Sequence, residues 1–316
     1  MPHTFPPALF GVLLSLVAGC LAPGLDGEVG EEGAAGRDDA LVGERTTLWI
    51  HGRSSGAPTT VGAYDDFGYW GPGAEATGVA PVAVGWGGVD RIATSNGAVR
   101  DALDCFCTGE RACYVAAHSA GESQIGYALA NYGDSERPLT DGVPDAEGRC
   151  APTGEVQKGW SVLWVDVAAG ASGGSELGDL GSWAVSDPLA ADMQVATART
   201  AYDHHETRGV TFYRFAGARG KAYAALLPGQ DDGTVSYHSA GGLALPGAFC
   251  NPGDPFCDDT LRYGEEGSWL GKDYVPKWAG HVVYHRDDAE VRDHFTRGVW
   301  GGIVAEVRAD IAAHAF

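Results

Sequence analysis

Five short apolar runs constrain the fold of this chain more than any other feature of its sequence. Each run is rich in β-branched or aromatic residues, does not alternate with polar residues, and is followed by a loop or a helical pattern. A strand that is apolar on both sides is covered on both faces, which is typical of the parallel sheets of α/β proteins. We therefore predict buried strands at 46–50, 80–85, 112–117, 161–167 and 210–215.

Helical patterns lie between and after these runs. Apolar residues recur at helical spacing over 125–132, where Gly133 supplies a stop, and again over about 287–313. Strand, helix and strand in repetition require parallel pairing with crossover connections. We predict an α/β fold with a mostly parallel central sheet and helices on both faces, formed by residues 46–316. The segment 236–280 is rich in Gly, Pro and Asp and is interpreted as loop with one strand.

The N-terminus carries an export pattern. An apolar stretch over 8–17 ends in Val-Ala-Gly-Cys at Cys20, which resembles a bacterial lipoprotein signal peptide. That resemblance implies that residues 1–19 are removed, that Cys20 is lipidated, and that the protein is anchored in the bacterial cell envelope. The acidic, Gly-rich segment 20–45 is then a flexible tether. The alternative is an ordinary cleaved signal and a secreted, soluble protein.

Cysteine count and net charge restrict the class further. Apart from Cys20 six cysteines remain, which could form three disulfides whose pairing the sequence does not choose, with Cys250–Cys257 as the most local possibility. The chain has 21 Lys+Arg against 42 Asp+Glu, a formal net charge of −21. Because a surface this acidic repels phosphate backbones, we exclude nucleic acid as a partner. We expect membrane contact through the N-terminal lipid only, and neither a metal ion nor a cofactor.

The sequence Ala117-His118-Ser119-Ala120-Gly121 stands directly between a predicted buried strand and a predicted helix. A serine in this position sits on a tight, strained turn that exposes its hydroxyl above the sheet edge, and the turn tolerates only small residues two positions to either side. Ala117 and Gly121 satisfy that demand. The Ala120 N–H, at the start of the helix, is placed to stabilise an oxyanion. The alternative is a serine that only caps the helix.

A second copy of the string tests this interpretation. His238-Ser239-Ala240-Gly241 repeats four residues of the motif, but Tyr237 occupies the position that must be small, and no buried strand precedes it. We interpret Ser239 as a loop residue.

The turn at Ser119 resembles the nucleophile turn of the α/β-hydrolase superfamily, with Ala117 in place of the usual first Gly. Two further segments fit that resemblance. His51-Gly52 ends the first strand, as in bacterial lipases and esterases, which implies that the Arg53 N–H completes the oxyanion hole. Asp232 stands in a D-G-x-V sequence like that of the superfamily's acid, with Asp231 as its rival.

The order of the superfamily, Ser then Asp then His, places the base after Asp232. The resemblance favours His281, which follows Gly280 ahead of the last helical pattern, and leaves His285 as the runner-up. His238 is too close to the acid, and His294 and His314 are expected within the last helix.

These residues predict a serine hydrolase that cleaves carboxylic esters of a lipid-like or other small-molecule substrate. His281, oriented by Asp232, takes the proton of Ser119, and the N–H groups of Ala120 and Arg53 stabilise the oxyanion before water attacks the acyl-enzyme. The same residues could serve an amide or peptide hydrolase or an acyltransferase. A non-catalytic envelope lipoprotein with a hydrolase-like binding domain is the alternative from a different class.

Overall fold

The computed structural model describes residues 44–54, 59–71, 74, 77–180, 187–217, 226–227, 231–241, 266–267, 273–274, 276–284, 294 and 303–315. The signal peptide, Cys20, the pair Cys250–Cys257 and His285 lie outside the described residues, and so does the tether apart from its last two residues. Among the described residues, no helix has the length and apolar character needed to cross a bilayer.

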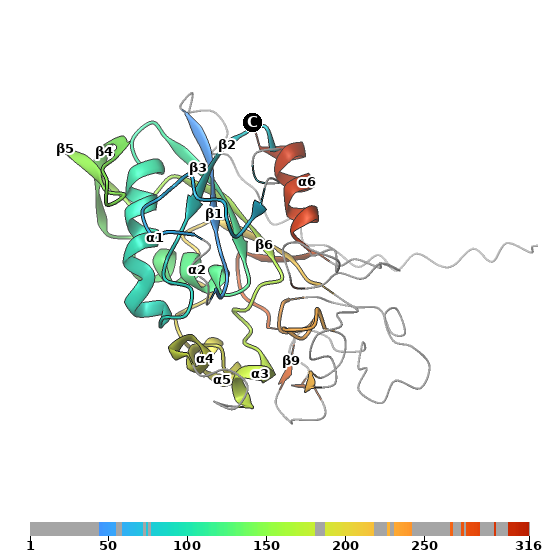
Figure 1. Cartoon of the computed structure of the whole chain (residues 1–316). Helices are drawn as coiled ribbons and strands as arrows, with labels where there is room; N and C mark the ends of the chain where they lie inside the picture. Colours follow the sequence, from blue (N-terminus) through green and yellow to red (C-terminus); the bar gives the residue numbers. More distant parts are fainter. Residues whose placement is uncertain are drawn as a thin grey trace, which may run out of the picture. The chain divides into compact units, whose positions relative to one another are not determined.

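Six parallel strands form the central sheet (Figure 1). They are arranged in the order β10-β7-β6-β3-β1-β2, and every neighbouring pair is parallel. Their bounds are β1 Arg45–Ile50, β2 Ala80–Val84, β3 Ala112–His118, β6 Val162–Ala168, β7 Thr211–Phe215 and β10 His281–Tyr284. The five predicted strands are therefore confirmed, with ends that differ by at most one residue. β10 is a sixth strand that the sequence did not predict.

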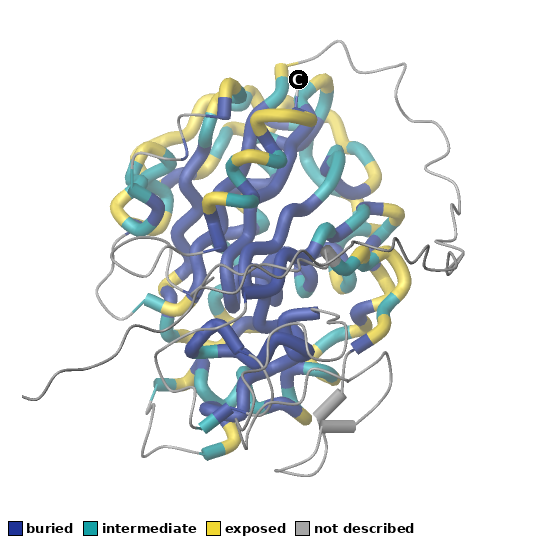
Figure 2. The backbone as a smooth tube through the Cα atoms, turned by 90° about the vertical axis from the view of Figure 1, so that its right-hand side faces the viewer, coloured by how far each residue is buried: buried dark blue, intermediate teal, exposed yellow. Residues whose placement is uncertain are grey.

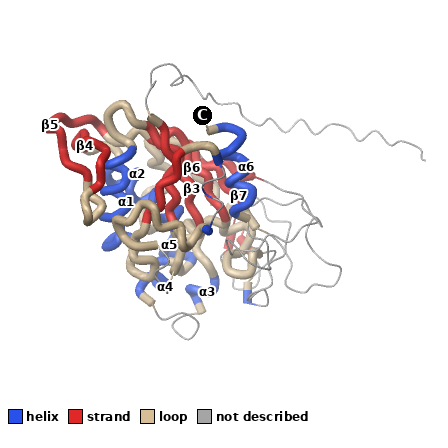
Figure 3. Tube along the Cα trace, turned by 45° about the horizontal axis from the view of Figure 1, so that its top comes forward, coloured by secondary structure: helices blue, strands red, loops and turns tan. Residues whose placement is uncertain are grey.

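Helices cover both faces of this sheet, on opposite sides of the strands (Figures 1 and 3). On one face α1 (Ile92–Phe106) and α2 (Gly121–Tyr132) pack in a buried cluster with Leu48 and Ile50 of β1. On the other face α6 (Val304–His314) packs in a cluster with Trp49. Side chains alternate between the faces of a strand, so a run that is apolar throughout supplies both clusters. The predicted α/β fold is confirmed, and the strands form its buried centre (Figure 2).

The remaining described elements are short or lie at the margin of the sheet. After β6 the chain forms three short helices, α3 Glu176–Asp179, α4 Pro188–Asp192 and α5 Val195–Ala198. β8 (Glu266–Gly267) pairs with β9 (Asp273–Tyr274) in a separate two-stranded sheet, so the segment 236–280 contains two short strands where one was predicted.

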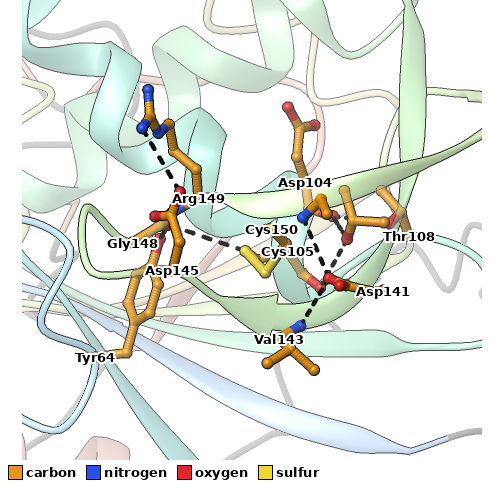
Figure 4. The surroundings of a disulfide bond; sticks show 12 residues. Tyr64, Asp104, Cys105, Thr108, Asp141, Val143, Asp145, Gly148, Arg149 and Cys150 are labelled. Atoms are coloured by element: carbon orange, nitrogen blue, oxygen red, sulfur yellow. Dashed lines mark hydrogen bonds and ion pairs between the residues drawn. A yellow bond between two sulfur atoms is a disulfide. The ribbon is translucent and has the colours of Figure 1, made fainter.

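An antiparallel hairpin of β4 (Glu136–Pro144) and β5 (Cys150–Lys158) follows α2. A disulfide between Cys105 of α1 and Cys150 of β5 links the hairpin to α1, with a Cα–Cα distance of 5.2 Å (Figure 4). A second disulfide joins Cys107 to Cys113 between α1 and β3. Two of the three possible disulfides are thus present among the described residues, which agrees with the even cysteine count.

The last helix is shorter than its pattern predicted. α6 begins at Val304, and His294 lies in a bend rather than in a helix. The expectation that His294 belongs to the last helix is therefore wrong. Gly298, Gly301 and Gly302 explain the difference, because glycine costs a helix about 1 kcal/mol per residue relative to alanine.

Candidate active site

Ser119 connects the end of β3 to the start of α2 through a strained backbone. Its φ is +54°, in the left-handed region that residues with a Cβ rarely adopt. The Ser119 N–H donates to the Ala168 carbonyl at 3.1 Å, and the Ser119 carbonyl accepts from the Ala171 N–H at 3.2 Å. These bonds to the end of β6 and to the loop after it hold the turn, as the tight-turn prediction requires.

The exposure predicted for Ser119 is not found, because only 6% of the residue's surface is accessible. Gly52 contacts it on one side, and the ring of His294 lies against its hydroxyl. The hydroxyl therefore sits in a desolvated environment, where hydrogen bonds are electrostatically stronger than in water.

Gly121 explains why the motif requires a small residue two positions after the serine. A Cβ at Gly121 would lie 2.8 Å from the His51 carbonyl oxygen and closer still to that of Ile50, both of them backbone atoms at the end of β1. The first turn of α2 can approach the strand end only without a side chain here. This packing directs the N-terminus of α2, with the backbone N–H groups of its first turn, toward Ser119.

Ser119, His294 and Asp232 form one hydrogen-bonded series. His294 Nε2 lies 2.8 Å from Ser119 Oγ, and His294 Nδ1 lies 2.8 Å from Asp232 Oδ2. The His294 N–H also donates to the Asp232 carbonyl at 2.9 Å. Because Nδ1 faces a carboxylate, it carries the ring proton, which leaves Nε2 free to accept the serine proton. The three residues can therefore generate a nucleophilic hydroxyl.

A tight turn after β7 presents the Asp232 carboxylate. Asp232 Oδ1 accepts the N–H groups of Thr234 at 2.9 Å and Val235 at 2.7 Å, which leaves Oδ2 for His294. Asp231, the rival candidate, instead accepts the Gly233 N–H at 2.6 Å and so stabilises the turn itself. The D-G-x-V sequence thus identified the carboxylate that faces a histidine.

The structure does not bring His281, the predicted base, to Ser119. His281 is the first residue of β10, and its ring stacks on Phe212 at a centroid distance of 4.6 Å. Its Nε2 donates to the His204 carbonyl at 3.2 Å, and its Nδ1 lies 3.9 Å from Glu122 Oε1. Burial, together with the nearby Arg214, lowers the pKa of His281 strongly. The position beside Ser119 that was predicted for His281 is occupied by His294.

The other described histidines that follow the acid, His238 and His314, lie apart from the series. His238 Nε2 is 3.8 Å from Glu176 Oε1, and His314 lies within α6 as expected. A weak sequence signal did point to His294: the three glycines that follow it break the helical pattern, so the segment before them need not be helical.

The His51-Gly52 segment lies against Ser119, as predicted from its position at the end of β1. A Cβ at Gly52 would lie 2.6 Å from Ser119 Cβ. His51 is buried, stacks on Trp86 and accepts the Trp86 N–H at Nε2, at 3.3 Å. Desolvation lowers its pKa to about 4, so its ring is neutral at neutral pH and its Nδ1–H donates to the Gly52 carbonyl at 2.6 Å.

This contact determines the direction of the next N–H. The Gly52 carbonyl and the Arg53 N–H belong to one trans peptide group, in which they point in opposite directions. Because His51 holds the carbonyl, it also orients the Arg53 N–H. The Arg53 guanidinium is occupied elsewhere, since its Nε donates to Asp187 Oδ2 at 2.7 Å. Among the described residues, no acceptor takes the N–H of Arg53 or of Ala120.

Comparisons with known proteins add the following. No family model matches the chain, and no curated protein matches it. The mature lipase BlEst2 of Bacillus licheniformis is 14% identical, with a TM-score of 0.49 over 86% of this chain and 93% of that one. EstA of Clostridium botulinum is 12% identical, with a TM-score of 0.49 over 87% of this chain and 88% of that one.

Proposed function

We propose that the protein is a serine hydrolase that cleaves carboxylic esters through an acyl-enzyme, with Ser119 as nucleophile, His294 as general base and Asp232 as the acid that orients it. The observation that carries the proposal is the pair of 2.8 Å hydrogen bonds that link the Ser119 hydroxyl through the His294 ring to the Asp232 carboxylate. His294 replaces His281 in this role.

In the acylation step, Ser119 Oγ attacks the carbonyl carbon of the ester while its proton passes to His294 Nε2. The ring becomes an imidazolium, which the Asp232 carboxylate stabilises through Nδ1–H. As the tetrahedral intermediate collapses, the bond to the alcohol oxygen breaks and Nε2–H protonates that oxygen. Water then attacks the carbonyl carbon of the acyl-enzyme while His294 Nε2 takes its proton. The bond to Ser119 Oγ breaks, Nε2–H returns the proton to that oxygen, and the carboxylic acid product is released.

The backbone N–H groups of Ala120 and Arg53 are the proposed oxyanion donors. Both follow residues that touch the reacting centre, and α2 adds the positive end of its dipole beside Ala120. The His51 contact supports the role of Arg53, because it fixes the orientation of that N–H before substrate binds. The protein part of the oxyanion hole is thus formed by backbone alone.

An ester is the proposed substrate because the His-Gly pair at the end of β1 resembles that of bacterial lipases and esterases. The same residues could perform amide hydrolysis or acyl transfer, since the fold and the three side chains do not determine the acceptor. A panel of p-nitrophenyl esters of increasing chain length, compared with casein, separates these activities.

The test of the mechanism uses a fluorophosphonate probe together with hydrolysis of p-nitrophenyl acetate. Ser119→Ala is expected to abolish labelling and to lower kcat by at least about 10⁴-fold. Ser239→Ala is the matched control, since Ser239 stands in the same His-Ser-Ala-Gly string but bonds to the Arg199 guanidinium at 3.1 Å. Labelling that survives in Ser119→Ala, or that is missing from the wild type, would refute the proposal.

The assignment of the base has its own comparison. His294→Asn is expected to lower kcat by about 10⁴-fold or more, because no other ring contacts Ser119 Oγ among the described residues. His281→Asn is expected to lower the melting temperature but to keep kcat within about fivefold, because its contacts are with His204 and Phe212. The reverse pattern would restore His281 as the base.

A further inference from the structure

His118, the neighbour of the nucleophile, is buried beside the site and has no role in the mechanism above. Only 2% of its surface is exposed, and its ring lies 4.7 Å from the His294 ring, centroid to centroid. Its Nε2 lies 2.5 Å from the His294 carbonyl oxygen, and its Nδ1 lies 2.5 Å from Tyr69 Oη.

These two contacts determine where the protons are. A carbonyl oxygen can only accept, so His118 Nε2 carries the ring proton and donates it to His294. A neutral ring has one N–H, so Nδ1 accepts and the Tyr69 hydroxyl donates. Burial agrees with this, because desolvation lowers the pKa of His118 well below its usual value and raises that of Tyr69.

Tyr69 also lies against the segment proposed as the oxyanion hole. A Cβ at Gly52 would lie 2.9 Å from Tyr69 Oη, whose proton is donated to His118. Tyr69, His118 and the backbone of His294 are therefore joined by two hydrogen bonds in one direction, both between neutral groups. We name Tyr69 and His118 the Tyr69–His118 relay.

The relay has a specific geometric consequence for His294. The Asp232 carboxylate bonds to His294 Nδ1, and the Asp232 carbonyl accepts the backbone N–H of His294. The other backbone group of His294, its carbonyl, accepts from His118 Nε2–H. Because His118 is bonded covalently to Ser119, its bond ties the backbone of the base directly to the strand end that carries the nucleophile. Proton transfer needs donor and acceptor within hydrogen-bond reach, and displacements of about 1 Å can cost about 10²-fold in rate.

We propose that His118 is a positioning residue whose Nε2–H holds the backbone of His294 in register with Ser119, and that Tyr69 fixes the ring of His118 and packs against Gly52. The proposal rests on the proposed function, since it assigns His118 a role in the reaction of Ser119 and His294. His118 itself exchanges no proton with substrate.

The first test replaces His118 with two amides that reach different distances. A Gln side chain places its amide near the position of His Nε2, whereas an Asn amide lies near Nδ1 and cannot reach the His294 carbonyl. His118→Asn is expected to lower kcat for p-nitrophenyl acetate about 10- to 100-fold with KM changed less than about threefold, and His118→Gln to recover most of that loss.

The matched control is His204→Asn. His204 is also buried, its pKa is also lowered by desolvation, and its Nε2 also donates to a backbone carbonyl, that of Ala198 at 2.9 Å. His204→Asn is expected to lower the melting temperature as much as His118→Asn does but to leave kcat near the wild-type value. If kcat follows the melting temperature across these variants, or if His118→Asn keeps the wild-type kcat, the proposal is overturned.

Tyr69 is tested against another partly buried tyrosine. Tyr69→Phe removes the donor to His118 and is expected to lower kcat about three- to tenfold. Tyr64→Phe removes a comparable hydroxyl, which donates to the Gly148 carbonyl at 2.5 Å beside the β4–β5 hairpin (Figure 4), and is expected to leave kcat unchanged. Equal effects of the two substitutions would contradict the role of Tyr69.

A readout without activity separates this proposal from the proposed function. Nitrogen-15 NMR of the wild type is expected to show His118 neutral, with the proton on Nε2, and His118→Asn is expected to broaden or shift the Nδ1–H signal of His294. If the wild type has no Ser119-dependent activity but shows these signals, the proposed function fails and the relay stands. A His118 ring with its proton on Nδ1 refutes the relay whatever the activity.

Discussion

Ser119 holds an unfavourable backbone conformation at the point where its hydroxyl is needed. With φ at +54°, its Cβ crowds the neighbouring carbonyl, at a cost of about 1–2 kcal/mol. The bonds to the end of β6 and to the loop after it, together with the contact of Gly121 with β1, impose this conformation. The strain follows from the turn that places the hydroxyl between the start of α2 and His294.

This strain predicts different stabilities for two inactive variants. Ser119→Gly is expected to be about 0.5–1 kcal/mol more stable than Ser119→Ala, because glycine adopts positive φ freely although it loses more entropy on folding. Urea unfolding of both variants gives the difference. An alanine variant that is the more stable of the two would show that the left-handed turn is not strained.

Gly52 lies where no side chain fits. A Cβ there would lie 2.6 Å from Ser119 Cβ and 2.9 Å from both the His118 carbonyl and Tyr69 Oη. Gly52→Ala is expected to push the segment away from Ser119, to lower kcat about 10²-fold and to cost about 1–3 kcal/mol of folding free energy. Kinetics with p-nitrophenyl acetate and urea unfolding measure the two effects.

Gly97→Ala in α1 is the control for Gly52. A Cβ at Gly97 would meet only the end of the Arg100 side chain, at 3.9 Å. This substitution is expected to stabilise the helix by about 0.5–1 kcal/mol and to leave kcat unchanged. A Gly52→Ala variant with wild-type kinetics would argue against the proposed position of the Arg53 N–H.

At the scale of elements, the β4–β5 hairpin is attached to α1 mainly by its disulfide and by Asp104. Asp104 pairs with Arg137 and accepts the Trp160 indole N–H at 2.7 Å. The disulfide Cys105–Cys150 spans 45 residues and Cys107–Cys113 spans 6. Loop-closure entropy then gives upper values of about 4 and about 2 kcal/mol for the two bonds.

Replacing both cysteines of each pair with serine tests this order. The variant without Cys105–Cys150 is expected to lose more folding free energy than the variant without Cys107–Cys113. The hairpin follows the C-terminal end of α2, about 18 Å along the helix from its start beside Ser119, so kcat is expected to be unchanged wherever the variant is folded. Urea unfolding and the esterase assay measure both quantities. An equal loss of stability from the two pairs would argue against the loop-closure account.

The buried carboxyl group of Asp166 in β6, which lies beside Asp310 of α6, predicts a pH dependence of stability. Burial raises the pKa of Asp166 to about 8, and the neighbouring carboxyl of Asp310 adds to the shift. The unfolded chain ionises near 3.8, so between about pH 4 and pH 8 the folded state keeps a proton that the unfolded state has lost. Stability from this group is therefore present at low pH and is lost as the pH rises, by up to about 1.4 kcal/mol per pH unit.

Asp166→Asn is expected to remove this dependence. The variant and the wild type should have similar stabilities near pH 5, and the variant should be the more stable one at pH 8, because the amide carries no charge to desolvate. Melting curves at both pH values measure the difference. Parallel curves for the two proteins would refute this interpretation.

Other titratable groups lie near this carboxyl pair. They include His314, at 3.2 Å from Asp310, and Tyr213, whose pKa is raised mainly by burial.

At the scale of the whole molecule, we propose that the chain is exported and anchored by a lipid on Cys20, with the acidic segment 20–45 as its tether. Cys20→Ser is expected to shift the protein from the membrane fraction to the soluble fraction and to abolish incorporation of radiolabelled palmitate in a bacterial host. Cell fractionation with immunoblotting measures the shift. A wild-type protein that takes up no palmitate would favour the ordinary cleaved signal instead.

The sequence by itself determined the parallel sheet and the strained turn at Ser119. It also indicated that the His51-Gly52 segment lies against Ser119 and that the carboxylate of Asp232 faces a histidine. Each of these is a local pattern, in which the chemical requirement and the residues that meet it lie within a few positions of one another. The strands were found because continuous apolar runs report burial on both faces.

Only the tertiary structure decided which histidine faces Ser119. His294 lies 175 residues from Ser119 and 62 from Asp232, so its place depends on how the segment before α6 folds against the sheet. The order of residues along the chain admits several histidines equally. The relay through Tyr69 and His118 depends in the same way on contacts between distant segments, since a hydrogen bond is specified by the positions of two atoms and not by the spacing of residues.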